Sequence, residues 1–232
     1  MKYPAVVAAA VGLLTIAPHA FAGDLKGTVR FLGAAPRKVP LIMNGDPVCM
    51  REHKGPVYSE TVVVNGDGTM ANVIISVKEG PVLKTAPPPA QHALLSQKGC
   101  VYIPHVVCLQ TGQALDIVND DPTLHNVHSL ARENPAFNRA QPRKGMSMTV
   151  SFDKPEIFKI KCEVHPWMSA YVGVFTTPFF AVTGNDGTYT IRNLPAGDYT
   201  IEAWQELYGT REIHLHVKGT GVSLCDFSYP GK

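Results

Sequence analysis

The chain reads EIFKIKCEVHPWMSAYVGVF over residues 156–175, and the fold that we expect follows from this segment. Apolar and polar residues alternate from Glu156 to Cys162, which is the pattern of a β-strand with one face in a core. Phe158, Ile160 and Cys162 share the buried face, because successive side chains of a strand point to opposite sides. A second strand is expected over Ala170–Phe175. The residues between the two strands therefore form a loop at one end of a sheet.

Strand patterns recur along the rest of the chain, and no segment beyond the first 22 residues keeps a 3.6-residue apolar period. Turn-forming residues separate the strands, as in Asn65-Gly-Asp-Gly68, which predicts a hairpin, and in Asn119-Asp-Asp-Pro122. We therefore predict an all-β fold of packed antiparallel strands, with short helices at most. Further strands are expected over Gly27–Gly33, Thr61–Val64, Asn72–Val77, Ala114–Asn119, Phe180–Ile191 (a second hairpin) and Asp198–Trp204.

Four potential metal ligands lie at the loop ends of these strands. Cys162, His165 and Met168 are spaced so that one tight loop can turn all three toward a single point. His125, in Leu124-His-Asn-Val-His128, follows the turn cluster that ends an earlier strand. Two imidazoles, one thiolate and a weak axial thioether are the ligands of a type 1 copper site. The sequence therefore predicts that His125, Cys162, His165 and Met168 bind one copper ion.

The loop from Cys162 to Met168 and the run His125-Asn-Val-His128 resemble those of the cupredoxins, and the loop length is closest to amicyanin. The resemblance covers about residues 95–177 and implies a Greek-key β-sandwich with His125 as a ligand and His128 as its neighbour. It implies that Asn126 donates its backbone N–H to the Cys162 sulfur and ties the two ligand loops together. It further implies that apolar residues, including Trp167, surround an exposed edge of His165, which serves as the electron port.

Over nearly its whole length the chain also resembles secreted bacterial proteins that carry the labels methylamine utilization protein or carboxypeptidase regulatory-like domain. The C-terminal part is similar to a small transthyretin-like β-sandwich and has too few strands to be complete. We expect it to borrow the Gly27–Gly33 strand or to pack on the copper domain. The expected divisions are a signal peptide (1–22), N-terminal strands and loops packed with the other two parts (23–94), the cupredoxin copper-binding core (95–177) and the carboxypeptidase regulatory-like extension (178–232).

The first residues predict export from the cytoplasm. Lys2 precedes a short apolar run over Ala5–Ala17, and Ala20-Phe-Ala22 before Gly23 has the small-x-small cleavage pattern of a signal peptide. A bacterial periplasm is the expected compartment, with no membrane span after cleavage. Removing residues 1–22 takes one lysine away, so the formal net charge falls from +2 to about +1. This charge gives no support to nucleic-acid binding.

Five cysteines minus one copper ligand leave four, which can form two disulfides in an oxidising compartment. Three pairings are open in principle. We favour Cys49 with Cys100 and Cys108 with Cys225, because Cys49 and Cys100 recur in the proteins that the chain resembles. The alternative is a second metal site that uses Cys49 and His53 with Cys100 and His105. His214 and His216, which share one face of a late strand, are a further candidate for loose metal binding.

An enzymatic function has no sequence motif to support it, since the zinc-protease helix, the serine nucleophile elbow and the phosphate loop are all absent. Four protein ligands also leave no open position on the metal for a substrate. We therefore expect a monomeric periplasmic blue copper protein, not an enzyme, that carries single electrons between redox proteins such as c-type cytochromes or a periplasmic dehydrogenase. The alternatives are a copper carrier or buffer, and a secreted β-sandwich interaction module without a redox role.

Overall fold

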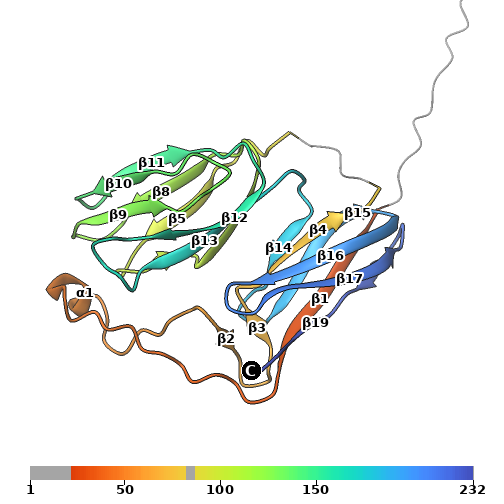
Figure 1. Cartoon of the computed structure of the whole chain (residues 1–232), viewed down its shortest axis with the longest axis horizontal. Helices are drawn as coiled ribbons and strands as arrows, with labels where there is room; N and C mark the ends of the chain where they lie inside the picture. Colours follow the sequence, from red (N-terminus) through yellow and green to blue (C-terminus); the bar gives the residue numbers. More distant parts are fainter. Residues whose placement is uncertain (1–21, 82–86, 232) are drawn as a thin grey trace, which may run out of the picture.

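The computed structural model describes residues 22–81 and 87–231, which form two β-sandwiches that lie side by side (Figure 1). In these residues there are 19 strands and one short helix, α1 (Pro47–Arg51). The predicted all-β fold class is confirmed. The predicted signal peptide falls almost wholly outside the described residues, and none of the described helices is long and apolar enough to cross a membrane.

The first sandwich is formed by residues 93–175. Its two sheets share one core, in which Leu95, Leu109, Ile117 and Ile160 are fully buried. The sheets are mixed and not purely antiparallel as predicted, because β5 (Ala93–Gln97) and β8 (Leu115–Asn119) pair in parallel, as do β7 (Val106–Gln110) and β13 (Ser169–Phe175). Alternation along a strand shows which face is buried but not the direction of the strand beside it. One sheet has the order β10 (Asn138–Gln141), β9 (His125–Ser129), β12 (Glu156–Lys161), β13 (Ser169–Phe175) and β7 (Val106–Gln110), and the other has β11 (Ser147–Val150), β8 (Leu115–Asn119), β5 (Ala93–Gln97) and β6 (Tyr102–Ile103).

The second sandwich combines strands from both ends of the chain around a separate core. The N-terminal strand β1 (Ala22–Leu32) pairs with β15, so the expected contribution of Gly27–Gly33 to the C-terminal unit is confirmed. One sheet has the order β14 (Phe180–Val182), β4 (Ile74–Glu79), β16 (Gly197–Gln205) and β17 (Gly209–Val217). The other has β15 (Thr188–Pro195), β1 and β18 (Val222–Leu224), with β19 (Phe227–Pro230) also paired to β1, and β2 (Val63–Val64) pairs with β3 (Met70–Ala71).

Two predicted hairpins are different in the structure. The turn at Asn65–Gly68 joins β2 to β3, whereas the apolar run that follows, Asn72–Val77, belongs mainly to β4 and pairs with β14 and β16. The segment Phe180–Ile191 also makes a tight turn, but its two strands enter opposite sheets of the second sandwich. The turn-forming residues identified both turns correctly. They do not show whether the strands on either side of a turn belong to the same sheet.

Burial on β12 follows the alternation of the sequence. Phe158 and Ile160 are buried in the first core, while Lys159 and Lys161 are partly exposed on the other face. The strand pairs with β13 from Glu156↔Val174 to Lys161↔Ser169, so residues 162–168 form the loop that closes this hairpin. The sheet therefore fixes both ends of the loop that carries three of the predicted ligands.

A long connection between β1 and β2, residues 33–62, packs against one end of the first sandwich, and we call it the cap. It folds back on itself through backbone hydrogen bonds from Leu41 to Val57 and from Ser59 to Val39, each 2.8 Å. Its helix α1 begins after Asp46, whose carboxylate accepts a hydrogen bond from the backbone N–H of Val48, as N-cap residues do. In Figure 1, α1 lies beside the first sandwich, far from β1.

The disulfide between Cys49 and Cys100 ties the cap to the first sandwich, which confirms one of the two predicted pairings. The other pairing is wrong, because Cys108 and Cys225 are free thiols. Cys225 is buried in the core of the second sandwich, whereas Cys108 is on β7 of the first. The expectation of two disulfides failed because a cysteine count carries no information about which sandwich each residue enters.

Replacing Cys49 and Cys100 together by serine should strongly destabilise the metal-free protein. The disulfide spans 51 residues, and closing a loop of this length lowers the entropy of the unfolded chain, which corresponds to about 4 kcal/mol. Urea unfolding of both proteins would measure the difference. The matched control is Cys108→Ser, which breaks no cross-link. Equal unfolding midpoints for the double variant and the wild type would show that the cap is not covalently tied.

Candidate metal centre

The predicted ligands come from two neighbouring strands and the loop that follows one of them. His125 is the first residue of β9, and Cys162 directly follows β12, which pairs with β9. The loop turns back tightly, because Cys162 N–H donates to Met168 O (3.2 Å) and Met168 N–H donates to His165 O (2.9 Å). Cys162, His165 and Met168 therefore lie at one end of the first sandwich, next to His125.

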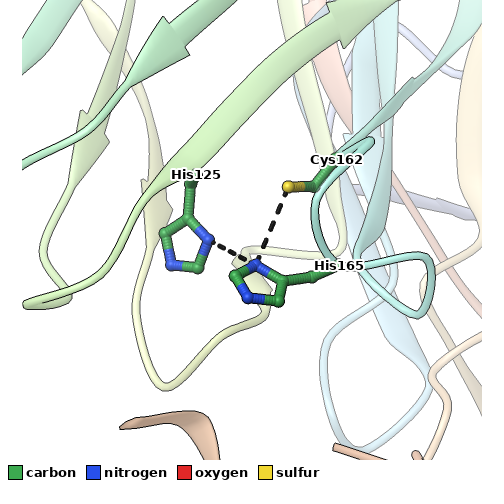
Figure 2. Close-up of side chains that lie close together, drawn as sticks. All are labelled: His125, Cys162 and His165. Atoms are coloured by element: carbon green, nitrogen blue, oxygen red, sulfur yellow. Dashed lines mark hydrogen bonds between the residues drawn. The ribbon is translucent and has the colours of Figure 1, made fainter. Parts of the chain in front are cut away.

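Three of the four predicted donors converge (Figure 2). The Nδ1 atoms of His125 and His165 are 2.9 Å apart, and Cys162 Sγ is 3.8 Å from His165 Nδ1. Together they form a group of ligand atoms that all lie within 4.8 Å of one another. All three side chains are buried, and Met168 is fully buried in the adjoining core. The arrangement brings two imidazoles and one thiol to a single point, with the thioether residue on the same loop.

Each of the two histidines is oriented by a carboxylate. His125 Nε2 lies 2.9 Å from Asp121 Oδ2, and His165 Nε2 lies 3.0 Å from Asp46 Oδ2. A carboxylate only accepts hydrogen bonds, so Nε2 of each ring carries the proton and donates it. The Nδ1 atoms then direct lone pairs at each other across 2.9 Å. Two facing lone pairs repel unless a proton or a metal ion lies between them, and a metal ion bound by both nitrogens is one way to meet this requirement.

The charges of the two carboxylates persist at neutral pH. Burial raises the pKa of Asp46, but hydrogen bonds from His165, Val48 and Thr123 lower it to about 2. The pKa of Asp121 is also lowered despite its burial, because His125 and the backbone N–H groups of Gly99 and Cys100 donate to it. Carboxylates on the outer nitrogens of metal-binding histidines fix the tautomer and raise the basicity of the ligand.

The surroundings of Cys162 favour the thiolate form of its side chain. Burial raises the pKa of this thiol, but hydrogen bonds with His125 and His165 and from the backbone N–H of Asn126 lower it to about 6. The N–H of Asn126 lies 3.5 Å from the sulfur. Since the thiolate is the form of cysteine that binds metals, the ligand is available at neutral pH.

Titration of the metal-free protein should detect a single thiolate forming near pH 6. Burial raises the pKa of the thiols Cys108 and Cys225, so neither ionises in this range. Because the folded-state pKa of Cys162 is below its unfolded value, this group adds stability above pH 9, and the contribution is lost as the pH falls through about 6. Ultraviolet absorbance of the thiolate measures the titration. The step should be absent from Cys162→Ser, and a step retained in that variant would assign it to another group.

Asn126 links the two ligand segments, as the resemblance implied. Its side-chain Oδ1 accepts a hydrogen bond from the backbone N–H of Glu163 (2.5 Å), one residue after Cys162. Its Nδ2 donates to Asn138 on the neighbouring strand β10. His128, in contrast, points away from the converging donors and pairs with Glu163, at a partly exposed position. The structure therefore separates His125, which belongs to the site, from His128, which does not.

The expected exposed edge of His165 is wrong, because only 2% of this residue is accessible to solvent. The cap covers the ring: Asp46 binds its Nε2, and the Sγ of Cys49 lies 3.7 Å from the same nitrogen.

Sequence reasoning missed both carboxylates that contact the histidines, Asp46 and Asp121. Asp121 could have been noticed, since it stands four residues before His125. No sequence pattern pointed to Asp46, because 119 residues separate it from His165.

The alternative second metal site is also not formed. Cys49 and Cys100 are joined in the disulfide, so neither offers a free thiolate. His53 lies 2.6 Å from the carbonyl oxygen of Gly99, and His105 pairs with Glu206 at 2.6 Å. The two histidines of β17 are similarly occupied by neighbours on the paired strand, His214 by Thr200 and His216 by Asp198. Among the described residues, these side chains do not converge on a common point.

Comparison with known proteins found no matching family model and no matching curated protein. Among solved structures, the chain is similar to a purple cupredoxin from Nitrosopumilus maritimus, with 22% identity and a TM-score of 0.31 over 35% of this chain and 98% of the other. A Cu-containing nitrite reductase from Thermus scotoductus shares 21% identity over 43% of this chain and 27% of its own, with a TM-score of 0.33. A Cu(I) form of an amicyanin variant shares 15% identity over 43% and 97%, also with a TM-score of 0.33. At these values the likeness assigns no family to the chain.

Proposed function

We propose that this chain is a type 1 copper protein that carries single electrons between redox proteins. The observation that carries the proposal is the convergence of His125 Nδ1, His165 Nδ1 and Cys162 Sγ within 4.8 Å at a buried point. This donor set suits copper in both oxidation states, because thiolate favours Cu(I) while imidazole is accepted by Cu(II). Copper, when bound, supplies a couple that takes one electron from a reduced partner and gives one electron to an oxidised partner.

The chain's own residues have distinct roles in this proposal. His125, Cys162 and His165 hold the metal strongly, and Met168 is the weak axial ligand. Asp121 and Asp46 hold the two imidazole rings in place from their outer nitrogens. The cap excludes water from the ligands. A buried set of rigidly held donors keeps nearly the same geometry in both oxidation states, which is what rapid electron exchange requires.

We further propose that the protein acts in the periplasm and is not an enzyme. The predicted signal peptide and the disulfide that ties the cap both suit an oxidising compartment. Partners would be one-electron redox proteins, such as c-type cytochromes or a periplasmic dehydrogenase. A metal with four protein ligands under a cap offers no position to a substrate.

The test is to load the purified mature protein with Cu(II) and to record its visible spectrum and its voltammogram. We expect an intense blue band from thiolate-to-copper charge transfer and reversible one-electron cycling with the metal retained. Release of copper on each reduction would instead favour the alternative role of copper carrier or buffer. Absence of the band would leave a secreted β-sandwich module without a redox role.

A further inference from the structure

The cap separates the proposed ligands from the protein surface, where a redox partner would bind. All four proposed ligands are buried, with exposed fractions of 0% for His125 and Met168, 1% for Cys162 and 2% for His165. A partner protein therefore cannot contact a ligand ring directly. Some other group must connect the ligands to the surface.

We propose that Trp167 is this group and that electrons enter and leave the site through its indole ring. The inference rests on the proposed electron-transfer function and adds the route. The ring centroids of Trp167 and His165 are 5.0 Å apart with an interplanar angle of 44°, a distance at which aromatic rings are in contact. Trp167 is partly exposed, so one side chain touches both the ligand ring and the surface.

The indole ring is held in a fixed orientation. Its Nε1–H donates a 3.0 Å hydrogen bond to the carbonyl oxygen of Cys100, the residue that anchors the cap disulfide. The same disulfide therefore fixes both the cap over His165 and the ring beside it. A side chain held in this way keeps its contact with the ligand during every encounter with a partner.

The other neighbours of His165 are poorer routes. Asp46 contacts the ring through a hydrogen bond to a carboxylate, which has no extended π system, and its oxygens are further occupied by Val48 and Thr123. The two cysteines of the disulfide are completely buried. Among the described residues, Trp167 is the partly exposed aromatic side chain in contact with a ligand ring. Contact between delocalised π orbitals couples two groups more strongly than a path through saturated bonds.

Several apolar side chains lie beside the indole ring of Trp167. The indole borders a small cavity of about 40 Å³, whose walls include Leu41, Val57 and Tyr58 of the cap and Val101 of the first sandwich. In each half-cycle one electron passes through the ring, toward the site from a reduced partner or away from it to an oxidised one. No bond is made or broken, and Trp167 itself ends each transfer unchanged.

Kinetics test the route, and the chain offers a matched control because it contains two tryptophans, Trp167 and Trp204. Trp204 packs against Tyr171, with ring centroids 4.9 Å apart, and does not contact a proposed ligand. Stopped-flow oxidation of the Cu(I) protein by ferricyanide should be several-fold slower in Trp167→Leu. The rate should be largely restored in Trp167→Phe, which keeps an aromatic ring, and unchanged in Trp204→Leu. The blue band and the potential should be the same in all four proteins.

Fluorescence gives a second readout that does not depend on turnover. Trp204→Phe leaves Trp167 as the single emitter, and its emission should be largely quenched when Cu(II) binds. Trp167→Phe leaves Trp204, which should keep most of its emission. Both variants of the fluorescence test keep an aromatic ring at the substituted position. The test can therefore be made even if Trp167→Leu does not fold.

The outcomes separate the route from the function. A wild-type rate in Trp167→Leu with an intact blue band would overturn the route while leaving the proposed function standing. Equal quenching of the two tryptophans would also overturn it. A missing blue band in the wild type would instead refute the copper function on which the route depends.

Discussion

Replacing Cys162 by serine should abolish the blue band of the copper-loaded protein completely. The band arises from charge transfer between a thiolate and Cu(II), and a serine hydroxyl supplies no such transition. The variant should also lose most of its preference for Cu(I), because thiolate is the soft donor among the strong ligands. Visible absorption and competition with a chromophoric Cu(I) chelator measure the two effects. The fold should persist, since serine nearly matches the volume of the cysteine at this position on the loop.

Two free thiols outside the site provide controls for this prediction. Cys108 and Cys225 are free, and neither belongs to the group of converging donors. Cys108→Ser and Cys225→Ser should therefore keep the band with unchanged intensity. A blue band that survives in Cys162→Ser and disappears in one of the controls would assign the metal to a different sulfur and overturn the proposed site.

The position of the loop that carries Cys162, His165 and Met168 could be predicted because its geometry is local. Alternation from Glu156 to Cys162 placed the sulfur at the end of a buried face, and the structure buries that face in the first core. The spacing of Cys162, His165 and Met168 on one hairpin loop then left few ways to arrange their side chains. His125 was found because a turn cluster placed it at the same end of a strand. Each of these inferences depends on neighbours within a few residues.

Features that depend on distant pairing could not be predicted. Asp46 of the cap contacts His165 across 119 residues of sequence, and the cap buries His165, which local reasoning had placed at the surface. The same limit explains the wrong pairing of Cys108 with Cys225, since local sequence does not say which sandwich a strand enters. The turns at Asn65–Gly68 and within Phe180–Ile191 were recognised for their residues, yet their strands pair elsewhere. Periodicity reports burial, and the choice of partner strand depends on the whole chain.

The carboxylate behind His125 should control both copper affinity and reduction potential. Asp121→Asn keeps the size of the side chain but removes its negative charge, so the imidazole becomes a weaker base and Cu(II) loses electrostatic stabilisation. We expect copper affinity to fall by about 10- to 100-fold, the usual cost of losing such a partner, and the reduction potential to rise. The same change at Asp46 should act in the same direction through His165.

Asp120 is the matched control for this prediction, because it neighbours Asp121 in the chain and binds Ser96, not a ligand. Asp120→Asn should leave copper affinity and potential unchanged, as measured by chelator competition and voltammetry. Asp121 also accepts hydrogen bonds from the backbone N–H groups of Gly99 and Cys100, each 2.7 Å, so its loss could act by loosening that turn. The two explanations differ in their consequences. A loosened turn lowers the stability of the metal-free protein without moving the potential of the bound metal, whereas loss of the charge behind His125 must move that potential.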